Sequence, residues 1–128
     1  MKLDNQLLDT LSGQAKANPR LRQSYDLRTT PEDQSKRMLN ALEPDTIMPI
    51  HRHRNTAETM VMVRGKLIER FYDDNGNINE EFVMEPCGQY PMVQIDAGQW
   101  HSLEILEEGT VISRQRMVRI RQLQMMMF

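Results

Sequence analysis

The sequence predicts an all-β domain, an antiparallel sandwich or barrel, preceded by one α-helix. From Met38 onward, short runs rich in β-branched and apolar residues alternate with turn residues. Two turns stand out, Arg64-Gly65 and the run at 73–77, whose Asn75-Gly76 pair is a strong hairpin signal. Seven short strands at this spacing favour a sandwich or barrel, and we expect them at 46–53, 56–64, 66–72, 79–84, 90–95, 100–106 and 110–118.

The segment before these strands is expected to be a helix followed by loop. Leucine and alanine recur at helical spacing behind Asp4, a plausible N-cap, so residues 4–17 should form an amphipathic helix that Pro19 ends. Residues 20–38 are rich in charged side chains and predict loop and short turns that wrap the domain. The 128 residues suit a single domain, divided into 1–37 (helix and wrapping segment), 38–118 (barrel) and 119–128 (tail).

Composition excludes several classes of function. The net charge of −2 gives no basic surplus for nucleic-acid phosphates. No apolar run is long enough to span a membrane, and the acids among the first ten residues leave no room for a signal peptide. One cysteine, Cys87, cannot form an intramolecular disulfide. We therefore expect a cytoplasmic protein without nucleic-acid or membrane partners.

Metal-ligating residue types are concentrated in two segments. His51 and His53 lie two residues apart in an extended run, so their imidazoles share a face, and Glu58 can reach the same face from the adjacent strand. In the run Asp-Ala-Gly-Gln-Trp-His at 96–101, Gly98 permits a tight turn before His101. All three histidines of the chain lie in these two segments. Three imidazoles and a carboxylate suit one divalent transition-metal ion, Zn, Fe, Ni or Mn. The alternative is that the histidines are surface and core residues without a metal.

The spacing of these residues resembles the motifs of the cupin superfamily. Its first motif reads His-x-His, four residues, Glu, six residues, Gly, and its second contains Gly-x-x-His; the matching positions here are His51, His53, Glu58 and Gly65, then Gly98 and His101. Asp96 replaces the proline of the second motif and Ile105 its asparagine. The resemblance implies an RmlC-like jelly-roll β-barrel with His51, His53, His101 and Glu58 as the metal ligands.

Residues 1–118 are more narrowly similar to the small WbuC-type cupins. The runs at 18–27, 37–46 and 51–59 carry this similarity. Those proteins are associated with O-antigen gene clusters, so the resemblance implies a metal-binding cupin and suggests carbohydrate metabolism. Because small cupins are often dimers, we also expect a homodimer. The apolar end formed by Met125, Met126, Met127 and Phe128 needs cover from the barrel or from a partner.

Strand alternation suggests what else lines the pocket. If Glu58 points inward, then Met60 and Met62 do too, alongside Leu103 and Ile105.

Arg70 and Tyr72 share one face of 66–72 and, if that face is inward, could supply a cation for a substrate anion and a phenol for acid–base catalysis beside Glu58. If the other face is inward, Glu69 enters beside Phe71 instead. Arg20 and Arg22 could reach over the barrel mouth to bind an anionic ligand, although a solvated loop is the simpler interpretation.

Three functions fit these residues. The first is a metal-dependent enzyme, such as an isomerase or epimerase, that acts on a sugar or sugar nucleotide. The second is an Fe(II)-dependent dioxygenase of a small molecule, with Glu58 as the exchangeable ligand. The third is a cupin that binds a small ligand, such as a carbohydrate, without turnover.

Overall fold

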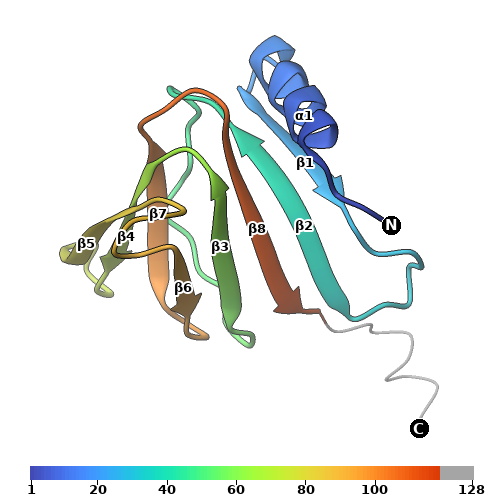
Figure 1. The fold of residues 1–128 in the computed structure, drawn as a ribbon. Coiled ribbons are helices and arrows are strands. Elements are labelled where there is room, and N and C mark those ends of the chain that lie inside the picture. The colour runs from blue at the N-terminus through green and yellow to red at the C-terminus, as the bar shows by residue number, and fades with distance from the viewer. Residues whose placement is uncertain (119–128) are drawn as a thin grey trace, which may run out of the picture.

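Two antiparallel β-sheets and one helix make up the computed structural model, which describes residues 1–118 (Figure 1). The first sheet has the strand order β1(Arg22–Asp26)-β2(Ser35–Leu42)-β8(Thr110–Met117)-β3(Glu58–Arg64)-β6(Met92–Ile95). The second has the order β5(Ile78–Met84)-β4(Leu67–Tyr72)-β7(Trp100–Ile105). The predicted all-β class with an N-terminal helix is confirmed, and the architecture is that of a jelly roll. The strands form two facing sheets rather than one closed wall, and the predicted tail at 119–128 lies outside the described residues.

One hydrophobic core lies between the two sheets. Its buried side chains come from both layers and comprise Leu42, Met60, Met62, Leu67, Met84, Ile105 and Ile112. Along β3, the buried side chains of Glu58, Met60 and Met62 alternate with half-buried ones, so the prediction that the two methionines point inward with Glu58 is confirmed. Toward one end of the sandwich, the side chains that point between the sheets are polar instead of apolar. The candidate site lies at this end.

A second core lies on the other face of the five-stranded sheet, under α1(Asn5–Ala17). The helix begins where it was predicted, because the Asp4 side chain caps it by accepting a hydrogen bond from the Leu7 N–H at 2.9 Å. Leu8, Leu11 and Ala15 pack from the helix against the sheet. Within residues 1–118, no helical segment is long and apolar enough to traverse a bilayer.

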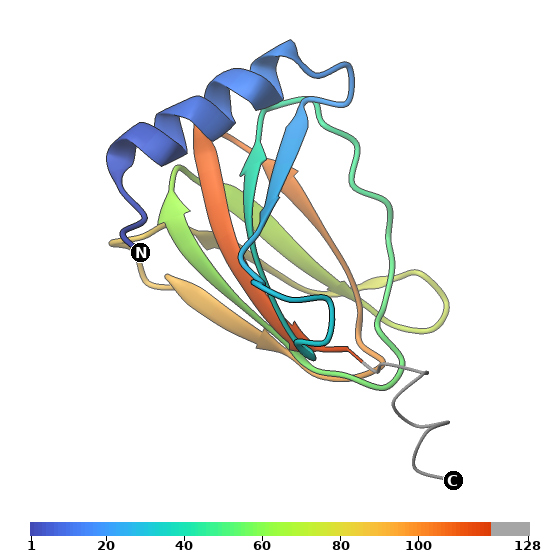
Figure 2. The same ribbon diagram turned by 90° about the vertical axis from the view of Figure 1, so that its right-hand side faces the viewer.

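Two expectations about the first half of the chain are wrong. Residues 20–38, expected as loop, contain β1 and the beginning of β2, which pair with each other from Arg22↔Leu42 to Asp26↔Met38. Residues 46–53, expected as a strand, form only the isolated bridge His51↔His101. Figure 2 shows the connection between β2 and β3 as a long irregular segment that runs alongside the sheets.

Glycines make the two turns that bring the strands of the site together. Gly65 has a φ of +82° between β3 and β4, and a Cβ there would lie 2.7 Å from Thr110 Cα, so only glycine fits. Gly98 has a φ of +85° and its N–H donates to the His53 carbonyl at 2.8 Å. The second turn therefore joins the two histidine segments directly.

Candidate metal centre

Backbone hydrogen bonds hold the three histidines against one another. His51 and His101 form a bridge in which each N–H donates to the other's carbonyl, at 3.0 Å and 2.9 Å. His53 follows two residues later and is held by Gly98. Imidazole nitrogens of the three residues all lie within 4.8 Å of one another. The prediction that these three histidines converge is confirmed, and they can hold a metal ion.

The hydrogen bonds of His51 decide which of its nitrogens is available. Its Nδ1 lies 3.0 Å from the Pro49 carbonyl oxygen. Because a carbonyl can only accept, Nδ1 carries the proton and Nε2 has a lone pair for a ligand. A metal-ligating histidine typically donates its second ring N–H in this way.

His101 is oriented by a buried carboxyl group. Its Nδ1 lies 3.1 Å from Glu69 Oε1, and the Glu69 side chain is 0% exposed. Burial, and secondarily the Glu58 charge, raises the pKa of Glu69 to about 8, while burial lowers the pKa of His101. Without a metal the pair is therefore a neutral hydrogen bond rather than an ion pair. His101 Nε2 is buried and has no hydrogen-bond partner in the described part of the chain.

His53 is kept neutral by its surroundings. Burial, reinforced by the nearby positive charge of Arg116, lowers the pKa of His53 to about 4. Its Nε2 is also buried without a hydrogen-bond partner among residues 1–118. A neutral imidazole with an unpartnered nitrogen is the form that binds a metal.

These observations fit a resident transition-metal ion. In the described part of the chain, the buried Nε2 atoms of His53 and His101 lack hydrogen-bond partners, and burial of such atoms is costly unless something binds them. Two of the three rings have their Nδ1 fixed by a second residue, Pro49 or Glu69. Three nitrogen donors with open positions are typical of first-row transition metals such as zinc and iron.

The structure does not bring Glu58, the expected fourth ligand, into this group. Among residues 1–118, the three histidines form the only group of three or more metal-ligating side chains whose ligand atoms all lie within 4.8 Å of one another. Glu58 is buried at the start of β3 and its Oε1 lies 3.4 Å from the Arg114 guanidinium. Glu58 lines the same cavity as His51 and His101 and is paired with Arg114 there.

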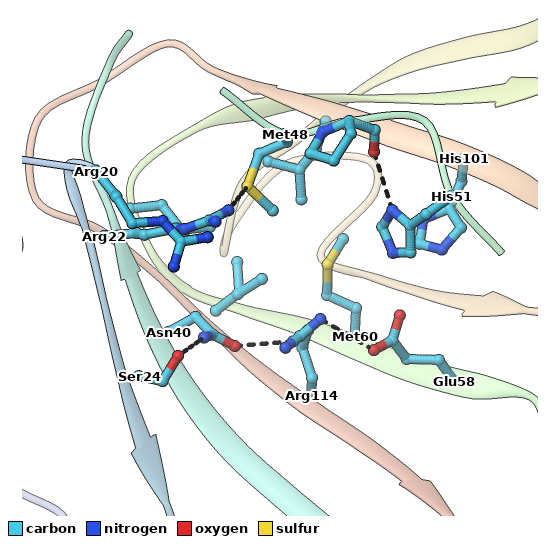
Figure 3. Close-up of a pocket in the computed structure, with 14 residues that line it drawn as sticks. Arg20, Arg22, Ser24, Asn40, Met48, His51, Glu58, Met60, His101 and Arg114 are labelled. Atoms are coloured by element: carbon cyan, nitrogen blue, oxygen red, sulfur yellow. Dashed lines mark hydrogen bonds and ion pairs between the residues drawn. The ribbon is translucent and has the colours of Figure 1, made fainter. Parts of the chain in front are cut away.

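A cavity of about 350 Å³ opens between the sheets beside the histidines (Figure 3). This volume is within the range of small-molecule sites, roughly 300–1,000 Å³. The cavity has apolar walls and polar groups at its ends; its lining comprises Arg20, Arg22, Ser24, Asn40, Leu42, Met48, Pro49, His51, Glu58, Met60, His101, Leu103, Ile112 and Arg114.

A chain of hydrogen bonds crosses the floor of the cavity from β1 to β3. Asn40 Nδ2 donates to Ser24 Oγ at 2.8 Å, and Arg114 Nε donates to Asn40 Oδ1 at 2.8 Å (Figure 3). Arg114 then reaches Glu58. The charge of Arg114 is thus satisfied within the protein. Neither Asn40 nor Arg114 was predicted to line the site. The strand that carries Asn40 was not foreseen, and Arg114, in a strand that was foreseen, is by its sequence alone an ordinary residue of a solvated strand face.

Arg20 and Arg22 line the end of the cavity that lies away from the histidines (Figure 3). Arg22 contacts the Met48 sulfur at 3.4 Å. Neither guanidinium has a carboxylate within salt-bridge distance in the described residues 1–118. The cavity therefore has unneutralised positive charge at one end and metal-ligating nitrogens at the other.

Arg70 and Tyr72 do not face the cavity, which corrects the inward orientation on which their expected roles depended. Arg70 forms ion pairs with Glu81 at 2.7 Å and Glu104 at 3.0 Å, and the Tyr72 hydroxyl lies 2.7 Å from Ser102 Oγ. β4 turns Glu69 inward instead, because Leu67 and Glu69 share the face that packs on the core. The sequence signal for this orientation was Leu67, an apolar residue two positions before Glu69 and therefore on the same face of the strand.

One further contact ties the two histidine segments together. The Arg52 guanidinium lies 4.4 Å from the ring centroid of Trp100, and Trp100 Nε1 donates to Asp74 at 3.2 Å. Arg52 lies between His51 and His53, while Trp100 precedes His101. This cation–π contact therefore fixes the irregular segment of the first motif to β7 of the second.

Solved cupin structures share this fold. KdgF from a Halomonas species has a TM-score of 0.63 at 13% identity, with 83% of this chain and 87% of that chain covered. The Cnp3 cupin domain of Schizosaccharomyces pombe has a TM-score of 0.61 at 9% identity, covering 84% and 72%. CapF, the capsular polysaccharide assembling protein of Staphylococcus aureus, has a TM-score of 0.62 at 24% identity, covering 77% of this chain but 26% of CapF. A search of curated proteins found no significant match.

A family match adds to this likeness of fold. The family described as a domain of unknown function, DUF6016, matches residues 3–84, which include α1, β1–β5 and the first histidine motif. The cupin fold and the convergent histidines thus come from the structure, and the match in sequence covers more than half of the chain. The chain belongs to the DUF6016 family, and its fold is that of the cupins.

Proposed function

We propose that this protein holds one divalent transition-metal ion on His51, His53 and His101 and binds an anionic sugar or sugar nucleotide in the adjoining cavity. One observation carries the proposal: a single cavity presents His51 and His101 at one end and, at the other, Arg20 and Arg22, which have no carboxylate partner among residues 1–118. A ligand with a hydroxyl or carbonyl at one end and an anionic group beyond it matches both.

The residues of the cavity have separable tasks. A bound ion would polarise a carbonyl or hydroxyl of the ligand and lower the pKa of coordinated water. Arg20 and Arg22 would neutralise the anionic group and set its distance from the histidines, while Leu103 and Ile112 exclude water from between. Glu58 is the carboxylate placed to accept a proton on the cavity wall, provided that the ligand displaces Arg114 from it.

A role in cell-surface polysaccharide metabolism is part of the proposal. It is supported by the fold that this chain shares with CapF, whose printed description is a capsular polysaccharide assembling protein, and by the resemblance to the WbuC-type cupins. The chain covers only about a quarter of CapF, so the shared part is one domain of that protein. A homodimer, a cytoplasmic location and a small-molecule partner stay predictions of this proposal.

The ion pair between Glu58 and Arg114 favours a second candidate function, ligand binding without turnover. A carboxylate already neutralised by a guanidinium is a poor general base. In this candidate the metal ion and the two arginines orient the ligand, and no proton is moved. An iron-loaded protein would favour the dioxygenase alternative instead, because O₂ and a substrate could occupy the open metal positions.

Metal analysis and ligand titration together test the proposal. Protein purified without a histidine tag should hold close to one equivalent of transition metal, and the His51→Ala, His101→Ala double variant should hold almost none. Calorimetric titration with sugar phosphates should then show binding that the Arg20→Ala, Arg22→Ala double variant weakens by at least about tenfold.

Arg70→Ala is the matched control, since its guanidinium is paired on the outer face. It should leave the titration unchanged. Equal metal content in wild type and the histidine double variant, or equal weakening by Arg70→Ala, contradicts the proposal.

A further inference from the structure

A second cavity adjoins the first at the arginines. It has a volume of about 320 Å³ and is lined by Pro19, Arg20, Leu21, Arg22, Asp45 and Ile47. Arg20 and Arg22 line both cavities, so these two residues lie between an inner space beside the histidines and an outer space beside Asp45. An anionic group held by both arginines would therefore have room for further ligand atoms on either side.

We propose that the ligand is a nucleoside-diphosphate-linked sugar, with its sugar in the inner cavity, its diphosphate on Arg20 and Arg22, and its nucleoside in the outer cavity. This inference rests on the proposed function and sharpens it. It places the anionic group in the middle of the ligand, whereas a simple sugar phosphate or sugar acid has its charge at one end.

The backbone holds the two arginines in this intermediate position. Leu21, between them, has a φ of +57°, which branched side chains rarely adopt. The conformation is locked on both sides, because Leu21 N–H donates to the Asn18 carbonyl at 2.9 Å and the Leu21 carbonyl accepts from Glu43 N–H at 3.0 Å. Thr46 Oγ1 also donates to the Arg20 carbonyl at 2.7 Å. The segment that carries the arginines is thus bonded to the segment that forms the other wall of the outer cavity.

The chemistry of the outer cavity suits a nucleoside better than a second anion. The Asp45 carboxylate would repel a terminal phosphate but accept hydrogen bonds from ribose hydroxyls. Ile47 is 83% exposed and, with Pro19, gives an apolar surface on which the face of a base can pack. Asp45 also has a positive φ, +73°, so its carboxylate is held at this position by an unusual backbone conformation.

The test compares UDP with inorganic pyrophosphate, because these probes share two phosphates and differ by the nucleoside. In calorimetric titrations UDP should bind at least about tenfold more tightly than pyrophosphate. Asp45→Asn, which keeps a residue that tolerates positive φ, should remove most of this difference without weakening pyrophosphate binding. Ile47→Ser should act in the same direction. Glu80→Gln, an exposed acid on β5, is the control and should change neither titration.

The outcomes separate this inference from the proposed function. UDP lacks the second sugar that would reach the histidines, so its binding should survive removal of the metal by a chelator, whereas glucose 1-phosphate should bind through the arginines without any dependence on Asp45. If UDP binds no better than pyrophosphate, or if Asp45→Asn weakens both alike, the inference is overturned while the proposed function stands. If neither UDP nor glucose 1-phosphate responds to loss of Arg20 and Arg22, both are wrong.

Discussion

The two ends of the cavity differ in how far the protein satisfies its own polar groups. At the histidine end, Nδ1 of His51 and of His101 contacts Pro49 and Glu69, respectively, and the buried Nε2 atoms of His53 and His101 have no hydrogen-bond partner among residues 1–118. At the arginine end, the backbone around Leu21 is firmly bonded, but the guanidiniums of Arg20 and Arg22 have no carboxylate within residues 1–118.

The difference indicates two kinds of occupant. Buried nitrogens that are oriented by second residues suit an ion that stays bound, because their geometry is set before it arrives. Exposed or half-buried guanidiniums tolerate solvent and suit a ligand that comes and goes. Under the proposed function, one end would therefore hold a resident metal and the other a transient anion, and the predictions below test this difference.

The largest expected effect is on metal binding when a ligand nitrogen is removed. Replacing a residue that only orients a ligand typically lowers metal affinity by roughly 10–100-fold. His101→Ala should lower it by more, because this change deletes a direct ligand. Competition with a chromogenic chelator measures the affinity. Pyrophosphate binding at the arginine end should persist and shows that the variant is folded; retained metal affinity would mean that His101 is a structural residue.

Replacing the carboxyl group behind His101 should have the next largest effect. Glu69→Gln keeps the size of the side chain but cannot supply the negative charge that a carboxylate provides behind a metal-bound imidazole. Metal affinity should therefore fall by about tenfold or more. Glu104→Gln, on the outer face of the same sheet, is the matched control. The same chelator competition distinguishes them, and equal effects of the two variants would contradict an orienting role for Glu69.

The pH dependence of the metal-free protein should expose the same buried group. The pKa of Glu69 is about 8 in the folded state against an ordinary value of 4.5, so between these values the folded protein retains a proton that the unfolded chain has lost. Stability from this group therefore falls as pH rises through that window. The pKa of His53 is about 4 against 6.5, so its contribution rises with pH and is complete above 6.5.

From pH 6.5 to 8 the Glu69 contribution therefore acts without opposition from His53. Urea unfolding of chelator-treated wild type should show a declining free energy of unfolding over this range. Glu69→Gln cannot titrate and should show a smaller decline or none. Parallel curves for the two proteins would mean that Glu69 is ionised in the folded state.

The smallest effect is expected at the contact that joins the two histidine segments. Arg52→Leu removes the stacking on Trp100, which is worth about 0.5–1 kcal/mol, and should lower metal affinity by roughly two- to fivefold. Arg54→Leu, an exposed neighbour, should leave metal affinity unchanged. An identical affinity of wild type and Arg52→Leu would show that the His51 bridge alone positions the segment.

The sequence by itself determined the features that depend on local chemistry. Asp4 capped the helix, the Asn75-Gly76 turn joined β4 to β5, and the spacing of His51, His53 and His101 predicted a shared site. Each of these follows from neighbours within a few residues or from a motif whose glycine turns, Gly65 and Gly98, are needed by the backbone itself.

Only the tertiary structure decided which polar residues face inward. β2 was not predicted because its cavity-facing side carries the polar residues Lys36 and Asn40, which in the sequence are typical of a loop. In the structure Asn40 accepts a hydrogen bond from Arg114 of the neighbouring strand β8. The inward position was assigned to Arg70 instead of Glu69, because a buried carboxyl group is unfavourable without a hydrogen-bond partner. In the structure that partner is His101, on a strand distant in sequence. The same physical reason applies to both strands. A buried polar side chain is stabilised by a contact with a neighbouring strand, and the pairing of distant strands cannot be deduced from one segment alone.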